Sequence, residues 1–377
     1  MGVSFGVLST YPSTQCGIAT FTEALSMHLQ RLGAEVGVVR MVDDLQPQSP
    51  PVVHQWVAAN SSAAAGVAQA LDEYDIALIQ HEYGIFGGPD GEDLLDVVHL
   101  LNVPVVSVLH TVLTDPTPNQ HRVLASLCEA SSALVTMTET ARGRLIDGWG
   151  IHPSRVTVIT HGAEDNRADP LDNRPTLGLR PTVLTWGLLG EGKGIEWALR
   201  AFAQVREIRP VPLYRIVGQT HPRVLERDGE AYRNHLVSLT RELDLTSMVR
   251  FDGTYLSGPM LRQIVRDADV ILLPYDSRDQ VTSGVLTEAV AAGKPVISTA
   301  FPHAVELLSD GAGLLVPQRD PGALAQALRR VLTEDGLADR MASTSRLLAE
   351  SQLWPAIAAR YISLGRSLVA ASTPSVA

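Results

Sequence analysis

The sequence predicts an α/β protein built from two doubly wound domains, and three observations lead to this prediction. Short runs rich in β-branched residues alternate with longer segments that are apolar at helical spacing, which is typical of βαβ units and a parallel sheet. A polar segment without periodicity divides this series into two halves. The length of 377 residues exceeds that of one ordinary domain and fits two domains.

The first series of strands lies in residues 1–165, which we predict to form an N-terminal Rossmann-like domain. Its expected strands are VSFGVL, EVGVVR, DIALIQ, VPVVSVL, SALVTM and RVTVIT. The first of them leads into IATFTEALSMHLQRLG, which is apolar at helical spacing and ends at Gly33, as helices commonly do. The opening segment MGVSFGVLSTYP lacks the basic start and long apolar stretch of a signal peptide, so we interpret it as a strand and expect a cytoplasmic protein.

The second series begins after a linker that we place at residues 166–180, because this region is rich in Pro, Asp, Asn and Arg and shows no periodicity. The expected strands then resume as PTVLTW, PLYRIV, MVRF, ADVILL, KPVIS and AGLLV, which defines a C-terminal Rossmann-like domain over residues 181–350. We predict that residues 351–377 form a helix, interrupted at Pro355, that packs back toward the N-terminal domain and ends in a frayed tail.

Composition and charge exclude several classes of protein. With 45% hydrophobic and 19% charged residues, and no apolar run near the ~20 residues that span a bilayer, the sequence is typical of a soluble globular protein. The net charge of −11 argues against nonspecific binding to nucleic acid. Cys16 and Cys128 lie far apart, so we expect reduced thiols. HEYGI begins like a zinc-protease helix but ends in Ile85 instead of a second histidine, and no metal or cofactor is expected.

The glycine-rich segment GLLGEGKGIEW, residues 187–197, carries one of only two lysines in the chain. Gly187, Gly192 and Lys193 have the spacing of a nucleotide-triphosphatase phosphate loop, but Gly194 stands where that loop needs Ser or Thr to hold magnesium. A glycine turn after a strand still exposes backbone amides, which together with an ammonium suit a diphosphate. The alternative is an ordinary turn with a solvated lysine.

A second candidate is PYDSRDQVTSGVLTEAVAAGK, residues 274–294, in which a polar loop follows a buried strand. Thr282 or Ser283 is expected to cap a helix that ends before Gly293, and the start of that helix would hold a phosphate. Glu288 lies one turn into this helix, where its carboxylate could accept hydrogen bonds from the two hydroxyls of a ribose. The alternative is a glutamate on the helix surface.

The first half contributes residues at strand ends, where ligands of doubly wound sheets bind. His110 and His161 each follow an expected strand, although a lone histidine is more often structural. Gly17 lies in the loop after the first strand, where the lack of a side chain would let a phosphate approach the helix start; a turn alone would also explain it. With two such domains, we expect the site in the cleft between them.

These segments, in this order, resemble the family 4 retaining glycosyltransferases of the GT-B fold. The resemblance runs from TYPSTQCGIATFT to LADRM and is strongest in GLLGEGKGIEWALRAF and SGVLTEAVAAGKPVIST. It implies two Rossmann-like domains facing across a cleft, a nucleotide-diphosphate sugar held by the C-terminal domain, and an acceptor held mainly by the N-terminal domain. It also implies transfer with retention and without a metal, because a lysine and helix amides stabilise the leaving diphosphate.

The resemblance assigns roles to individual residues. Lys193, in the turn that Gly187 begins, matches the lysine that clamps the diphosphate, and Glu288 matches the second glutamate of an E-x7-E pattern, which contacts the ribose. The remaining donor-side matches are the amide stretch Ser283, Gly284 and Val285, the N-terminal glycine loop at Gly17, and His110, which lies near the reacting carbon.

Two positions depart from the family pattern. The first glutamate of the pattern is replaced by Gln280, so either its amide or the neighbouring Asp279 would contact the sugar. The arginine that usually accompanies the lysine is replaced by Leu188, and Arg278 could compensate from the facing loop. Loss of one positive contact to a leaving group typically costs roughly 10²-fold or more in rate.

We therefore predict a cytoplasmic, metal-independent retaining glycosyltransferase that moves a sugar from a nucleotide-diphosphate donor to a hydroxyl acceptor, which could be a sugar, a glycan or a lipid-linked compound. The base is expected near residues 217–222 and 253–258, and the sugar near Asp279, Gln280 and His110. The expected acceptor-side residues are Tyr11, Glu82, Tyr83 and Gly84. A membrane lipid stays open as acceptor, although no strongly basic amphipathic helix supports membrane contact.

Two alternatives come from other classes of protein. Leu188 and Gln280 are compatible with a nucleotide-sugar binding protein that has little or no transferase activity. A nucleotide-sugar epimerase of the same fold would isomerise its sugar without any acceptor.

Overall fold

A computed structural model of the chain describes residues 2–58, 63–167, 180–254, 256–277 and 281–372. The chain divides into two compact units, Met1–Gly162 with Trp354–Ala377 and Ala163–Leu353. Most of the expected linker lies outside the described residues, which omit 168–179. Among the described residues, no helix is long and apolar enough to cross a bilayer.

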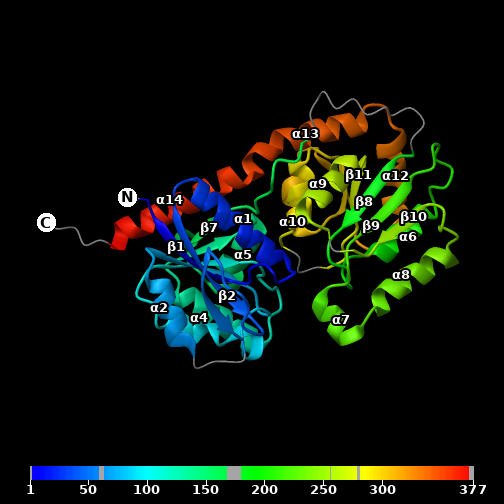
Figure 1. Ribbon diagram of the computed structural model, residues 1–377. Coiled ribbons are helices and arrows are strands. Elements are labelled where there is room, and N and C mark those ends of the chain that lie inside the picture. The colour runs from blue at the N-terminus through cyan, green and yellow to red at the C-terminus, as the bar shows by residue number, and fades with distance from the viewer. Residues whose placement is uncertain (1, 59–62, 168–179, 255, 278–280, 373–377) are drawn as a thin grey trace. The chain divides into compact units, whose positions relative to one another are not determined.

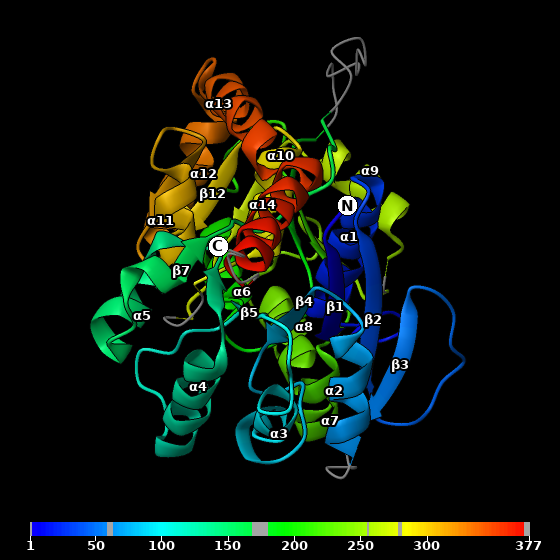
Figure 2. The ribbon, with the colours of Figure 1, turned by 90° about the vertical axis from the view of Figure 1, so that its left-hand side faces the viewer.

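The first unit is built on a parallel sheet whose seven described strands lie in the order β3-β2-β1-β4-β5-β6-β7 (Figure 1). The strands are β1 (Ser4–Ser9), β2 (Glu35–Val42), β3 (Val52–Val57), β4 (Ile76–His81), β5 (Val105–Leu109), β6 (Ala133–Thr136) and β7 (Val156–Val158). The six expected strands are confirmed, and β3 was missed. Figure 2 shows β3 at the edge of the sheet, where Val53 is exposed and the strand lacks the continuous apolar run of a central parallel strand.

Two helices from opposite ends of the chain cover one face of this sheet, α1 (Gly17–Arg31) and α14 (Trp354–Ser372). Phe21 and Leu25 of α1 and Tyr361 of α14 share a buried cluster with Phe5 of β1. The other helices of the unit are α2 (Ala64–Asp72), α3 (Leu94–Val98), α4 (Pro118–Ala130) and α5 (Glu139–Trp149). Pro355 occupies the first turn of α14, where a missing N–H costs nothing, and the helical run breaks before it, at the extended residue Leu353.

The second unit has a parallel sheet whose six described strands lie in the order β10-β9-β8-β11-β12-β13. They are β8 (Thr182–Trp186), β9 (Leu213–Val217), β10 (Val249–Asp252), β11 (Val270–Leu273), β12 (Val296–Thr299) and β13 (Gly313–Val316). All six were expected from the sequence, and the prediction of two Rossmann-like doubly wound domains is confirmed.

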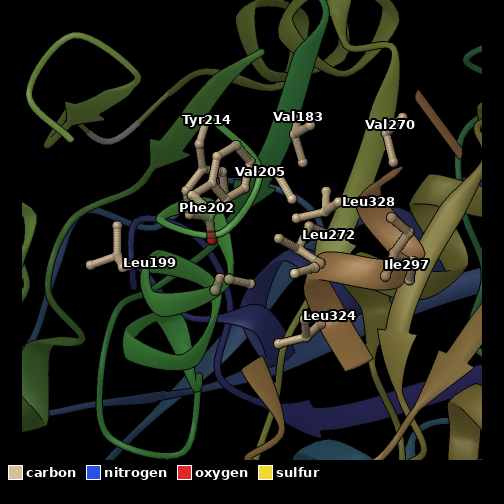
Figure 3. Packing of buried hydrophobic residues seen from close by; sticks show 14 of the residues in the cluster. Val183, Leu199, Phe202, Val205, Tyr214, Val270, Leu272, Ile297, Leu324 and Leu328 are labelled. Atoms are coloured by element: carbon tan, nitrogen blue, oxygen red, sulfur yellow. The ribbon is translucent and has the colours of Figure 1, made fainter. Parts of the chain in front are cut away.

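Helices cover both faces of this second sheet. One face carries α6 (Ile195–Phe202), α8 (Ala231–Glu242) and α12 (Pro321–Thr333), and the other carries α9 (Gly258–Asp267), α10 (Gly284–Ala291) and α11 (Pro302–Leu308). Figure 3 shows the first layer, in which the Phe202 ring stacks on Tyr214 of β9, with 4.6 Å between ring centroids. The remaining helices are α7 (Pro222–Asp228) and α13 (Leu337–Gln352).

The strand order of each sheet contains a switch point, at which successive connections leave toward opposite faces. The switch lies between β1 and β4 in the first unit and between β8 and β11 in the second. Doubly wound sheets bind ligands at the carboxyl ends of the strands at such a point. In the second unit this edge is formed by residues 187–194, after β8, and by the loop that follows β11.

Candidate functional site

The glycine turn at residues 187–194 is held by backbone hydrogen bonds to the neighbouring loop after β9. The amide of Leu189 donates to the carbonyl of Gln219 (2.8 Å), and the amide of His221 donates back to the carbonyl of Leu189 (2.8 Å). At the end of the turn, the amide of Lys193 donates to the carbonyl of Gly190 (3.3 Å) and leads the chain into α6. The turn therefore has a defined backbone instead of being a solvated loop.

Gly194 lets the glycine turn contact the segment after β11. Its φ of +62° favours glycine, and a Cβ there would lie 2.0 Å from the carbonyl oxygen of Pro274. Two residues earlier, the carbonyl of Gly192 accepts a hydrogen bond from the amide of Asp276 (3.1 Å). From the sequence we interpreted Gly194 only as the residue that replaces a magnesium ligand. The structure shows that glycine is also required here for close packing against Pro274.

The Lys193 ammonium lies over an aromatic ring. Its Nζ is 4.5 Å from the centroid of the Tyr275 ring. No carbonyl or carboxylate of the described residues accepts a hydrogen bond from it. Burial, followed by the charges of Arg223 and Lys193, lowers the pKa of His221, so this imidazole near the turn adds no second cation at neutral pH.

The start of α10 lies beside the glycine turn, since a Cβ at Gly187 would be 3.6 Å from Val285 Cγ2. Ser283 caps the helix by accepting a hydrogen bond from the Leu286 amide at its Oγ (3.2 Å). The Ser283 amide itself donates to Nδ1 of His303 (2.9 Å). Of the three amides expected to face a diphosphate, those of Gly284 and Val285 have no acceptor among the described residues, and that of Ser283 is already used.

Glu288 faces the end of β8 and is partly buried, which does not fit a freely solvated surface glutamate. Its Oε2 accepts a hydrogen bond from the Trp186 indole N–H (3.3 Å). Burial raises the pKa of Glu288 to about 7, against the opposing effects of the Trp186 hydrogen bond and the Arg262 charge. The carboxylate is therefore poorly solvated and would gain from further hydrogen-bond donors.

Side chains at the start of α8 contact the first of the two loops expected to hold the base, residues 217–222. Arg233 Nη2 donates to the Gly218 carbonyl (2.5 Å), and Arg233 Nε pairs with Glu230 (3.3 Å). Thr220 donates its hydroxyl to the same glutamate. The second loop contains residue 255, which lies outside the described residues, as do Arg278, Asp279 and Gln280, the expected sugar contacts.

Gly17, in the first unit, is the first residue of α1, behind the cap residue Cys16, whose sulfur accepts a hydrogen bond from the Ala19 amide (3.3 Å). A Cβ at Gly17 would meet no described atom within 4 Å, and its φ is not in the left-handed region. Neither a close contact nor a left-handed backbone among the described residues requires glycine here, and the approach of a ligand stays a prediction. Tyr11, earlier in the same loop, is half-buried, and burial followed by the Glu23 charge raises its pKa.

His110 follows β5 and is neutral. Its Nε2 lies 2.8 Å from Gln80 Oε1, so with this amide orientation Nε2 carries the proton and Nδ1 is an acceptor. Burial, with smaller contributions from His161 and His81, lowers the pKa of His110 to about 3. This side chain can exchange hydrogen bonds with a sugar but does not act as an acid near neutral pH.

His161 is held by packing. Its Nδ1 donates to the Gly162 carbonyl (2.7 Å), and its ring lies edge-on against Phe21, with 5.0 Å between centroids. These contacts give the ring a structural role.

Glu82 connects the loops after β4 and β5. One carboxylate oxygen accepts from the Tyr83 amide (3.0 Å) and the other from the Thr111 hydroxyl (2.5 Å), next to His110. Tyr83 is buried against His81, and its hydroxyl has no hydrogen-bond partner among the described residues. Gly84 follows in the same loop and is partly exposed. The structure thus brings Glu82 near His110, but it turns the Tyr83 hydroxyl into the interior.

Sequence reasoning missed four side chains that shape these sites: Trp186, Tyr275, His303 and Gln80. Trp186 and Gln80 were counted only as strand residues. Tyr275 follows Pro274 at a strand end, and His303 is the second residue of α11, the helix after β12. For Trp186, Tyr275 and Gln80, a polar or aromatic residue at or near the carboxyl end of an expected strand was the available signal, because that position faces the ligand edge. His303 lies in a helix, and this signal does not find it.

Two family models match successive parts of the chain. Residues 16–167 match the model described as Glycosyltransferase Family 4, and residues 180–334 match Glycosyl transferases group 1. The chain is 29% identical over 318 residues to a D-inositol 3-phosphate glycosyltransferase of Nocardioides, covering 76% of this chain and 66% of that protein. Its identity to a protein of the same name from Frankia alni is 27% over 384 residues, covering 91% and 92%. The chain spans about two thirds of the length of the first of these relatives.

Solved structures show the same fold. The crystal structure of Anabaena HepE in complex with UDP has a TM-score of 0.77 at 18% identity, covering 97% of this chain and all (100%) of that one. Sucrose-phosphate synthase from Thermosynechococcus elongatus has a TM-score of 0.76 at 20% identity, covering 98% and 100%.

Proposed function

Because the chain belongs to the family 4 glycosyltransferases, we propose that it transfers a hexosyl group from a nucleoside diphosphate sugar to a hydroxyl acceptor, with retention and without a metal. The observation that carries this proposal is the state of Lys193. Its ammonium lies at the ligand edge of a doubly wound sheet, over the Tyr275 ring, and no described residue neutralises it.

The donor diphosphate is the group that this edge suits. The Lys193 ammonium and the Gly284 and Val285 amides supply one charge and two dipoles from adjacent elements. Such donors stabilise the negative charge that develops on the leaving diphosphate as the glycosidic bond breaks. In this mechanism the leaving phosphate takes the proton from the attacking hydroxyl of the acceptor. No protein carboxylate then has to attack the sugar.

Glu288 supports recognition of a ribose. Two vicinal hydroxyls would donate to its carboxylate, for which the described part of the chain supplies one hydrogen-bond donor, the Trp186 indole. The neutral His110 supports a contact with a sugar hydroxyl through Nδ1, without a proton transfer. Glu82, Tyr11 and residues after His110 are proposed to face the acceptor.

Known ligands of similar proteins suggest the first compounds to test. HepE has been crystallised with UDP and with UDP-glucose, so UDP-glucose is the first donor. The relatives named above act, by their names, on D-inositol 3-phosphate, so a phosphorylated polyol is the first acceptor.

A thermal-shift panel of UDP, GDP and ADP sugars tests the donor site. A ligand at 100 times its dissociation constant stabilises a protein by about 2.7 kcal/mol. We expect at least one nucleoside diphosphate sugar to raise the melting temperature, and Lys193→Ala to weaken that shift. A panel without any shift would contradict the proposal. Retention is then read from the anomeric configuration of the product by NMR, and metal independence from equal rates with EDTA and with Mg²⁺.

The same assay distinguishes the two alternatives. A donor that binds, but whose sugar is not transferred to any of a broad set of acceptors, would indicate a binding protein. The replacement of the expected arginine by Leu188 motivates this alternative. Release of an isomerised nucleotide sugar without an acceptor would indicate an epimerase.

A further inference from the structure

We infer that Tyr275 is a positioning residue that holds the Lys193 ammonium on its ring face and leaves its charge available to the donor diphosphate. This inference rests on the proposed function, because it concerns the same donor site. The observation is the distance of 4.5 Å between Lys193 Nζ and the centroid of the Tyr275 ring. A cation at this distance over an aromatic face is attracted by the negative face of the ring.

The Tyr275 ring cannot move away from the lysine. Tyr275 is fully buried, at 0% exposure. Its ring packs against Phe301, with 5.3 Å between centroids, and its carbonyl accepts a hydrogen bond from the Thr299 hydroxyl (2.5 Å). Its own hydroxyl is buried without a hydrogen-bond partner among the described residues. A buried hydroxyl without a partner is unfavourable, so the ring and not the hydroxyl is the useful part of this side chain.

The backbones of Lys193 and Tyr275 are joined on both sides of the pair. Before Lys193, the Gly192 carbonyl accepts from the Asp276 amide (3.1 Å). After it, Gly194 approaches Pro274 so closely that a Cβ would lie 2.0 Å from the Pro274 oxygen. These two contacts lie on either side of Lys193 and Tyr275 along the chain. They hold the two backbones together, so that the ammonium lies over the ring.

The neighbouring carboxylate does not compete for the ammonium. Asp276 Oδ2 accepts hydrogen bonds from the Trp197 indole (3.2 Å) and from Arg319 Nε (3.0 Å). A carboxylate paired with Lys193 would cancel its charge, whereas an aromatic ring has no net charge. The ammonium can therefore rest on the ring and direct its remaining N–H groups at phosphate oxygens. The flexible lysine side chain is ordered before the donor arrives, which reduces the entropy lost on binding.

The ordering of the Lys193 side chain should contribute more to donor binding here than in a protein whose turn also carries an arginine. In this chain Leu188 stands at the position of that arginine, so Lys193 is the one cation of the turn. We expect loss of the ring face to weaken nucleoside diphosphate binding by between about 2-fold and 30-fold, the range of cation–π energies.

The contact itself can be tested without any ligand, because the chain has two lysines. Protein labelled with [ε-¹³C]lysine should show two Hε/Cε signals. The ring current of Tyr275 should move the Lys193 signal upfield, and Lys294 serves as the internal reference. We expect Tyr275→Phe to retain this shift and Tyr275→Leu to abolish it. A Lys193 signal that is the same in all three proteins would overturn the contact.

The role in donor binding is tested with a series of fluorinated phenylalanines at position 275. Fluorine withdraws electron density from the ring face and weakens its attraction for a cation, while the volume of the side chain changes little. UDP, GDP and ADP are each titrated by calorimetry into the wild type and into variants with Phe, monofluoro-, trifluoro- and pentafluoro-Phe. We expect the dissociation constant of the nucleotide that binds to rise stepwise with fluorination. The same fluorinated residues at Phe202, which stacks on Tyr214 in the core, should leave the dissociation constant of the nucleotide unchanged.

The possible results separate this inference from the proposed function. A dissociation constant that is constant along the series, or that falls, in a protein that binds a nucleotide would overturn the positioning role and leave the donor site intact. A wild type that binds none of the three nucleotides would overturn the proposed function, and the NMR comparison would still decide whether Tyr275 holds the lysine. If Tyr275→Leu does not fold, the fluorinated series gives the answer, since its members keep the ring.

Discussion

The two lysines of the chain lie in regions that differ in kind. Lys294 Nζ donates to the carbonyls of Arg266 (2.6 Å) and Ala268 (2.8 Å), where α9 ends. It therefore satisfies carbonyls that the helix leaves without partners. Lys193 Nζ lies over the Tyr275 ring, and no described carbonyl accepts from it. One ammonium is used by the fold, and the other is the one that we propose contacts the donor diphosphate.

The local sequence does not distinguish these lysines, because each directly follows a glycine. Their places in the topology do. Lys193 comes after β8, at the carboxyl edge of the sheet, whereas Lys294 comes just before β12, at the amino edge. Since doubly wound sheets bind ligands at the carboxyl edge, the order of strand and lysine along the chain carries the functional information.

The largest effect is expected from Lys193→Ala. Removing the ammonium takes away charge stabilisation of the leaving diphosphate, so kcat/KM should fall roughly 10²- to 10³-fold. The free energy of unfolding should fall by no more than about 1 kcal/mol, because the side chain is not part of the core and loses only its attraction to the Tyr275 ring. Steady-state kinetics and urea unfolding measure the two quantities. Unchanged turnover would make Lys193 a turn residue like any other.

Lys294→Ala should show the reverse pattern. Two carbonyls at the end of α9 would lose a charged donor, which should lower the free energy of unfolding by about 1 to 3 kcal/mol. The kcat/KM of the folded fraction should not change. Urea unfolding followed by circular dichroism measures the loss, and an activity loss without destabilisation would show that the two lysines do not divide their roles in this way.

Glu288 provides a pH-dependent test of the ligand edge. Its pKa in the folded protein is raised to about 7, so between the ordinary carboxyl pKa and pH 7 the folded state binds a proton that the unfolded state does not. The contribution of Glu288 to the free energy of unfolding then falls as the pH rises through this window. The gain in stability of Glu288→Gln over the wild type should be small near pH 5 and should grow to as much as about 2 kcal/mol at pH 8, after allowance for partial exposure.

The control for this test is the exposed Glu191, in the glycine turn. Glu191→Gln should leave the difference in unfolding free energy between pH 5 and pH 8 unchanged. A difference in unfolding free energy between Glu288→Gln and the wild type that is the same at pH 5 and pH 8 would contradict the raised pKa of Glu288.

Much of the fold could be predicted because parallel strands are buried on both faces and appear as apolar runs. The exception was β3, an edge strand with His54 and Gln55 in its middle. The sequence also located Lys193, Ser283 and Glu288 at strand ends and a helix start, since these positions follow from the order of elements. It could not show that the Ser283 amide is occupied by His303, because that contact joins residues 20 positions apart. The raised pKa of Glu288 likewise depends on burial beside Trp186, which spacing along the chain does not reveal.

The smallest effect is expected from Leu188→Arg, which introduces the arginine that the family resemblance expects beside Lys193. Leu188 is partly buried in a turn whose one cation is Lys193, so a guanidinium there should add a second, charge-assisted contact to the diphosphate. We expect kcat/KM to rise about 3- to 10-fold, less than a native contact is worth, because the surroundings have not adapted to the larger side chain. Leu188→Gln, similar in polarity but uncharged, should give no gain. If arginine lowers kcat/KM while donor binding tightens, the added charge stabilises the bound donor more than the transition state, and one pre-ordered lysine is then the arrangement that suits this chain better.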